Sequence, residues 1–87
     1  MLNDLLDQVI AIDTNTAFAY VGLLRSHDDD WIRLSEVAVY DRHDSRVSLE
    51  KFLIECRTFG HGSARGECLI QRHHVIAITP LEAVVAP

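Results

Sequence analysis

The sequence predicts a mainly β domain of five strands, with a short N-terminal helix and one helical insertion. Several segments alternate apolar and polar residues with a period of two, which is typical of half-buried strands. One segment, residues 48–59, instead spaces its apolar residues three or four apart, as a helix does. The chain has 87 residues, which is enough for one domain with a thin core.

The composition narrows the class of protein. Hydrophobic residues make up 48% of the chain and aromatic residues only 7%, so small aliphatic side chains dominate, and these suit a sheet and leave apolar surface for association. No apolar run approaches the roughly 20 residues of a membrane span, and the first residues are acidic rather than basic. We therefore expect a cytoplasmic protein without a membrane segment, in which Cys56 and Cys68 are reduced, buried thiols.

The first half of the chain predicts a helix followed by three strands. Three leucines share one face of a helical turn behind a polar start, which predicts a short helix over residues 2–7. Residues 9–13 and 17–25 then read as a hairpin joined by turn residues, and residues 31–40 alternate again as a third strand. Gly22 lies inside the second strand, where it indicates a sharp bend or the close passage of another backbone.

The second half begins with the clearest helix pattern. In residues 48–59 the apolar side chains follow helical spacing, Ser48 suits the N-cap and Gly60 suits the C-cap. A strand over residues 52–56 remains an alternative, because these residues also alternate. Residues 69–79 and 81–86 then predict two strands with a corner at Pro80, the first of them interrupted by a polar quartet.

A resemblance to a known family begins at that quartet. Residues 70–78, IQRHHVIAI, resemble the second signature of the Sm and Sm-like (LSm) family, Ile-Arg-Gly-x-x-Val-x-x-Ile, with both isoleucines and the valine in register and Gln71-Arg72 in place of Arg-Gly. The same residues resemble the Lys-His signature of the bacterial Sm-like RNA chaperone Hfq. Gly22, Leu24 and an aspartate in the next loop match the first Sm signature in part.

The resemblance implies a fold and an assembly. A divergent Sm-like protein would be an SH3-type, five-stranded barrel covering residues 1–87, with the helical insertion between the third and fourth strands and the second motif in residues 67–86. Such barrels form rings by pairing the fourth strand of one copy with the fifth of the next, and here a homo-oligomer of 5–7 subunits is expected. The residues expected at the interface are Val75, Ile76, Ile78, Leu81, Val84 and Val85. An open α+β sheet crossed by a helix is the alternative fold.

The resemblance also implies a ligand, which is single-stranded U- or A-rich RNA bound at the pore of the ring. A cation would meet phosphate there, and imidazole or indole rings would stack on bases. The net charge of −5 gives no long-range attraction to RNA, so binding would have to come from this local site. The candidate RNA-binding residues are Gln71, Arg72, His73, His74, Asp28 and Trp31. The alternative is that Arg72 and His74 lie on an exposed strand face or in subunit contacts.

Other site chemistries fit the sequence less well. The alternative for the run from His27 to Asp30 is a solvated acidic turn, with Trp31 packed against a neighbour. A hard cation held by His27, Asp28 and Asp30 is only weakly indicated, since the spaced carboxylates of a calcium loop are absent. The cysteines and histidines lack the close Cys pair of a zinc site, and no nucleophile or phosphate-binding signature is present. We therefore expect a protein without enzymatic activity, metal or cofactor. The rival function is a ring that acts as a protein-interaction scaffold and binds a basic partner through its acidic face.

Overall fold

The computed structural model describes residues 1–85. This part of the chain contains five strands, one α-helix and three short 3₁₀ helices, labelled η. The strands are β1 (Val9–Thr14), β2 (Phe18–His27), β3 (Trp31–Asp41), β4 (Arg65–Gln71) and β5 (Val75–Pro80). The helices are η1 (Leu2–Leu5), α1 (Leu49–Phe59), η2 (Arg72–His74) and η3 (Leu81–Ala83). The expected mainly β fold with a helix between the third and fourth strands is confirmed.

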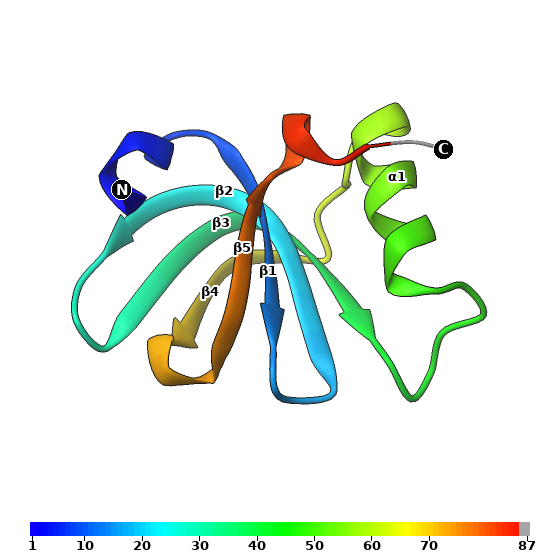
Figure 1. The fold of residues 1–87 in the computed structure, drawn as a ribbon, viewed down its shortest axis with the longest axis horizontal. Helices are drawn as coiled ribbons and strands as arrows, with labels where there is room; N and C mark the ends of the chain where they lie inside the picture. The colour runs from blue at the N-terminus through cyan, green and yellow to red at the C-terminus, as the bar shows by residue number, and fades with distance from the viewer. Residues whose placement is uncertain (86–87) are drawn as a thin grey trace.

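All neighbouring strands are antiparallel and form one sheet with the order β4-β3-β2-β1-β5. Figure 1 shows that the long strands β2 and β3 bend strongly, so that the sheet curls toward a barrel. Strands β4 and β5 follow one another in the sequence but lie on opposite edges of the sheet. Each therefore has one edge without a neighbouring strand in residues 1–85.

The bend is built around Gly22. A Cβ atom at this position would lie 3.1 Å from the backbone oxygen of Ser35 and 3.3 Å from the side chains of Leu34 and Val37. The pairing of β2 with β3 shifts at this point, and Glu36 takes a left-handed φ of 52°. These are the features of a β-bulge, in which one strand carries an extra residue and twists more strongly. The expected close passage of a second backbone at Gly22 is confirmed.

Replacing Gly22 by alanine is expected to lower the free energy of unfolding by about 1–3 kcal/mol, because the new methyl group has to displace backbone atoms of β3. Urea denaturation followed by circular dichroism measures this loss. Gly66→Ala is the matched control, since nothing lies within 4 Å of a Cβ at that strand position. Equal destabilisation of the two variants would contradict a role for the close contact.

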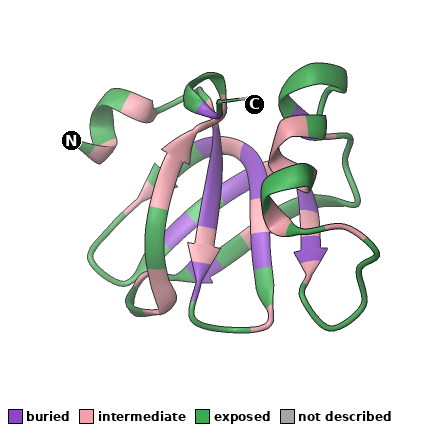
Figure 2. Cartoon of the chain, turned by 45° about the vertical axis from the view of Figure 1, so that its right-hand side comes forward, coloured by how far each residue is buried: buried purple, intermediate pink, exposed green. Residues whose placement is uncertain are grey.

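The core has two layers, one on each face of the bent sheet. The inner layer consists of fully buried aliphatic side chains and Ile70, namely Ile10, Ile12, Leu24, Ile32, Leu34, Val37 and Ile70. The outer layer is made of small side chains, Ala11, Val21 and Ala38, against which α1 packs through Cys56. Figure 2 shows α1 lying against this face. Small residues let a helix approach the sheet closely, so the insertion protects the face that would otherwise be exposed.

Helix α1 begins and ends as the sequence predicts. The Oγ atom of Ser48 accepts a hydrogen bond of 3.1 Å from the backbone of Lys51, and Gly60 ends the helix with a φ of 89°. The alternative of a strand over residues 52–56 is wrong. Both cysteines are free, but only Cys56 is buried, and burial raises the pKa of its thiol. Cys68 is half-buried on β4, so the expectation of two buried thiols is half correct.

The helix predicted over residues 2–7 is shorter and of a different type. Only residues 2–5 are helical, and they form a 3₁₀ turn. Asp7 takes a left-handed φ of 63°, and its backbone N–H donates to the carbonyl of Leu24 over 2.8 Å. This bond ties the N-terminal segment to β2 and directs the chain into β1. No helix in residues 1–85 is long and apolar enough to cross a membrane.

The positions predicted for the last two strands are wrong. The polar quartet does not interrupt a strand, because Gln71 ends β4 and Arg72–His74 form η2, which carries the chain to the opposite edge of the sheet. The fifth strand is therefore Val75–Pro80, and it pairs with β1. The predicted strand over residues 81–86 begins instead as the 3₁₀ helix Leu81–Ala83, and Ala86 lies outside the described residues.

Candidate nucleic-acid interface

Three connections between strands meet at one end of the sheet. One of them is η2, between β4 and β5, and it contacts the other two. The guanidinium Nη1 of Arg72 donates to the carbonyl of Asp28 over 2.6 Å, and its backbone N–H donates to the carbonyl of Asp30 over 2.8 Å. On the other side, the backbone N–H of Asn15 donates to the carbonyl of His74 over 2.9 Å, and the two side chains lie 3.1 Å apart. The turn η2 is thus held between the β1–β2 and β2–β3 connections.

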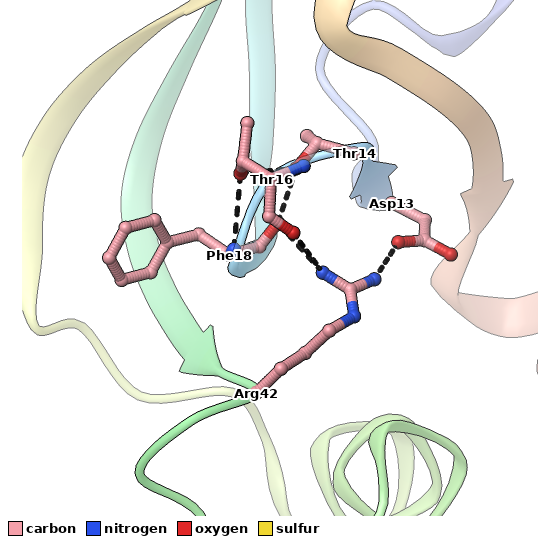
Figure 3. A network of polar contacts seen from close by, with 5 residues as sticks. All are labelled: Asp13, Thr14, Thr16, Phe18 and Arg42. Atoms are coloured by element: carbon pink, nitrogen blue, oxygen red, sulfur yellow. Dashed lines mark hydrogen bonds and ion pairs between the residues drawn. The ribbon is translucent and has the colours of Figure 1, made fainter.

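The β1–β2 connection is itself fixed by a polar network, which Figure 3 shows. The Thr14 hydroxyl donates to the carbonyl of Phe18 over 2.5 Å, and Thr16 contributes a further hydroxyl to the turn. Directly after β3, the guanidinium of Arg42 donates to the carbonyl of Thr16 over 2.8 Å and forms an ion pair with Asp13. Because the turn is held at both ends, Asn15 presents a fixed partner to His74.

Asp28 orders the β2–β3 connection. Its carboxylate accepts hydrogen bonds from the backbone N–H groups of Asp30 at 2.8 Å and Trp31 at 2.7 Å. These two bonds hold the pKa of Asp28 below its ordinary value, with a smaller contribution from the nearby Arg72. The side chain therefore shapes the loop that Arg72 contacts, and it fixes the backbone at the start of β3.

The Asp28 cap predicts an acid-sensitive loop. Because the ionised carboxylate is stabilised in the folded protein, its contribution is complete above the ordinary pKa of 3.8 and is lost as the pH falls through the lower folded value. Trp31 fluorescence, followed from about pH 6 to pH 2, is expected to report this opening. The variant Asp28→Asn keeps a hydrogen-bond acceptor but has no carboxylate, so an unchanged acid transition in that variant would contradict the assignment.

The predicted RNA-binding residues lie together at this end of the molecule. Gln71 pairs with Trp31 across β4 and β3, and Asp28 and Arg72 are in contact beside them. Gln71 and His73 are exposed, whereas Arg72 and His74 are half-buried by their contacts with the loops. The rings of His73 and His74 lie 4.2 Å apart between centroids, with a tilt of 41°. The imidazole ring of His73 is therefore exposed to solvent and packs against the ring of His74, which the loop contacts hold in place.

Trp31 contributes an aromatic surface next to this turn. Its side chain is 40% exposed at the first position of β3. A shallow cleft of about 410 Å³ lies beside it and is lined by Ser26, His27, Asp28, Trp31, Arg33 and Leu69. The indole of Trp31 and the guanidinium of Arg33 line the same cleft. A planar base can stack on the indole while a phosphate contacts the cation.

The contacts of Asn15 with His74 are a part of the site that sequence reasoning missed. Asn15 and His74 are far apart in the chain, so no local pattern joins them. The carbonyls of Asp28 and Asp30 that bind Arg72 are backbone groups, which the sequence does not mark. Within residues 1–85, no three histidine, cysteine, aspartate or glutamate side chains lie where they could hold a metal ion together.

The residues predicted at the oligomer interface differ in exposure. Ile76 and Val85 are 65% and 82% exposed, while Val84 is only 7% exposed and packs within its own protomer. The other predicted members are half-buried along β5 and at the start of η3, namely Val75, Ile78 and Leu81. The exposed residues are therefore available for contact with a second copy, and Val84 is not.

Comparison with solved structures classifies the fold. No protein-family model matches the sequence, and no curated protein is significantly similar to it. The Sm protein of Pyrococcus abyssii, solved with a uridine heptamer, superposes with a TM-score of 0.63 over 91% of this chain and 90% of that chain, at 16% identity. The chain has the Sm-like fold.

Two further structures show how widely the Sm-like fold occurs among the matches. A heptameric archaeal Sm protein superposes with a TM-score of 0.61 and 18% identity over 91% of this chain and 93% of that chain. A chain of the NatC complex bound to CoA superposes with a TM-score of 0.60 and 17% identity over 92% of this chain and 83% of that chain. The predicted Sm-like barrel is confirmed, and at these identities the likeness establishes the fold.

Proposed function

We propose that this protein forms a homo-oligomeric ring of 5–7 copies that binds single-stranded U- or A-rich RNA at its pore, without enzymatic activity. The observation that supports this most is the η2 cluster, in which Arg72, His73 and His74 are held against the loop that presents Trp31. The Sm-like fold supports it further, because a matching Sm protein was solved with a uridine heptamer and another is heptameric.

The edges of the sheet supply the surfaces for assembly. Strands β4 and β5 each leave a row of backbone N–H and C=O groups without a strand partner in residues 1–85. Such edges pair readily with another chain, and a β4 edge meeting the β5 edge of the next copy repeats around a closed ring. Ile76, 65% exposed on β5, would become buried in that contact.

The charge distribution decides how RNA is held. Arg72 is already bonded to a carbonyl of the loop, and Asp29 and Asp30 form no ion pair within the described chain. These carboxylates lie in the loop that Arg72 contacts, and at physiological salt they repel a phosphate that comes within a Debye length of about 8 Å. We therefore expect base stacking on Trp31 and His73 to supply most of the affinity, and the affinity to fall only weakly with salt.

Two measurements test the proposal. Light scattering on the purified protein is expected to give the mass of a closed oligomer, and a monomer mass would remove the ring. Titration of labelled oligo-U and oligo-A at low and moderate salt is expected to raise anisotropy and to change Trp31 fluorescence. An oligomer that shows neither change at micromolar concentration would instead support the scaffold function, which the unpaired Asp29 and Asp30 favour through attraction for a basic partner.

A further inference from the structure

A groove runs between α1 and β5 on the outer face of the sheet, and nothing in the described chain fills it. Its volume is about 360 Å³. The walls come from Leu49 and Leu53 of α1 and from Ala77 and Thr79 of β5, and Val85 stands at its rim with 82% of its surface exposed. The side chains on the β5 side are small, so the groove is open toward the free edge of the sheet.

The opposite edge of the sheet carries a side chain that suits this groove. On β4, Cys68 and Ile70 point into the inner core, while Leu69 between them points to the outer face and is 58% exposed. Leu69 is thus a large aliphatic side chain on a free edge strand, on the same face of the sheet as the groove. An isolated protomer leaves both the side chain and the groove in contact with water.

Side-chain alternation restricts how two copies could join these edges. If β4 of a second copy pairs antiparallel with β5, outer-face residues have to meet outer-face residues, because a shift of one residue would turn every side chain to the wrong face. The register that places Leu69 opposite Ala77 also places Ile70 opposite Ile76 and Cys68 opposite Ile78. Ile70 of the second copy then covers Ile76, which is 65% exposed in the isolated protomer.

Charge supports the same register. With Leu69 opposite Ala77, Arg65 of the second copy reaches the start of η3, where Glu82 is exposed. Neither Arg65 nor Glu82 forms an ion pair within residues 1–85. A shift of two residues that sets Leu69 opposite Val75 places Arg65 opposite Thr79 and moves this pair apart by roughly 7 Å, which is two strand positions. The opposite shift, with Leu69 opposite Thr79, places Arg65 opposite Ala83 and keeps it next to Glu82, so the cysteine pairs below decide between these two registers.

We propose that the groove between α1 and β5 receives Leu69 of a second copy, in the register that sets Leu69 opposite Ala77. The insertion containing α1 is then part of the subunit contact, because it forms the far wall of the groove. This inference rests on the proposed ring and specifies which side chains join its subunits.

Cysteine pairs test the register. In a Cys68→Ser background, Leu69→Cys combined with Ala77→Cys is expected to give a ladder of covalent oligomers on oxidation, because directly opposed residues lie within disulfide range. Leu69→Cys combined with Thr79→Cys is the matched control, displaced by two residues, and is expected to stay uncrosslinked. If the wild type is oligomeric, cross-linking of the control pair, or of neither pair, overturns the proposal. A monomeric wild type instead overturns the ring itself.

Two sets of variants test the contacts, both by the protein concentration at which the oligomer dissociates. Leu69→Ser is expected to raise that concentration by on the order of tenfold per interface, since the burial of one leucine is lost. Leu6→Ser, which alters a leucine that is 39% exposed outside both edge strands, is expected to leave the dissociation concentration unchanged.

Charge reversal tests the proposed ion pair. Arg65→Glu and Glu82→Arg should each weaken assembly, and their combination should restore it. An unchanged Leu69→Ser oligomer, or a combination weaker than both single variants, contradicts the inference.

Discussion

Replacing Ile76 by lysine is expected to convert the ring into monomers without unfolding the protomer. The side chain is 65% exposed on the free edge of β5, so the folded protomer accommodates a long cation there. A lysine on an edge strand opposes pairing with another strand, since its charge would have to be buried between two copies. The mass measured by light scattering should fall from that of the ring to that of a single 9.8 kDa chain.

The control for this prediction is Phe59→Lys. Phe59 is 84% exposed at the end of α1 and belongs to neither edge strand. This variant removes a comparable area of exposed apolar surface and adds the same charge, but it is expected to keep the mass of the ring. Circular dichroism should show the same strand content in both variants. An oligomeric Ile76→Lys protein would show that β5 is not a subunit contact.

Replacing Trp31 by alanine is expected to lower the affinity for oligo-U and oligo-A without changing the mass of the ring. Stacking of a base on an aromatic side chain contributes about 1–3 kcal/mol, which corresponds to roughly 5- to 150-fold in affinity. The side chain is 40% exposed and follows a loop whose backbone Asp28 holds, so its loss removes a stacking surface without emptying the core. Fluorescence anisotropy of labelled oligonucleotides measures the effect.

Phe59→Ala is the matched control for the stacking prediction, because it deletes an exposed aromatic ring at the end of α1, outside the cleft beside Trp31. It is expected to bind both oligonucleotides as the wild type does. Equal affinity of Trp31→Ala and wild type would mean that bases do not stack at this position. Equal losses in both variants would indicate a general effect of removing exposed aromatic surface.

Local sequence signals predicted α1 well, because a helix is specified by residues close together in the chain. Its apolar side chains fall on one face, Ser48 caps the first turn, and Gly60 ends the helix with a positive φ that favours glycine. The close contact at Gly22 was predictable for a similar reason. A glycine inside an apolar strand has few explanations other than a bulge or a close neighbour.

The C-terminal strands were misplaced because apolar content alone does not distinguish a strand from a packed turn. Residues 81–85 are largely apolar, and Leu81 and Val84 are buried in part or completely by packing rather than by a ladder. From the sequence alone, the polar quartet of residues 71–74 is an anomaly within a predicted strand. It is instead a turn that is stabilised from outside by Asn15 and by the carbonyls of Asp28 and Asp30.

The candidate site was predictable in its residue types but not in its contacts. Trp31 and the residues of η2 stand out in the sequence as polar or aromatic interruptions of apolar strands. They can therefore be recognised as candidate RNA-binding residues from the sequence alone. The bonds that position them join Arg72 to Asp28 and His74 to Asn15, pairs that are far apart in the sequence. A backbone carbonyl is present at every residue, so its use as an acceptor leaves no trace in the sequence.

The pairing of β5 with β1 has a consequence for the order of folding and assembly. Ile10 pairs with Pro80, so this ladder joins nearly the two ends of the described chain, and closing so long a loop is slow and entropically costly. In the proposed ring, β5 also offers its free edge to the next copy. A protomer in which β5 has not yet paired with β1 would lack a complete docking edge, so assembly would follow the folding of each protomer.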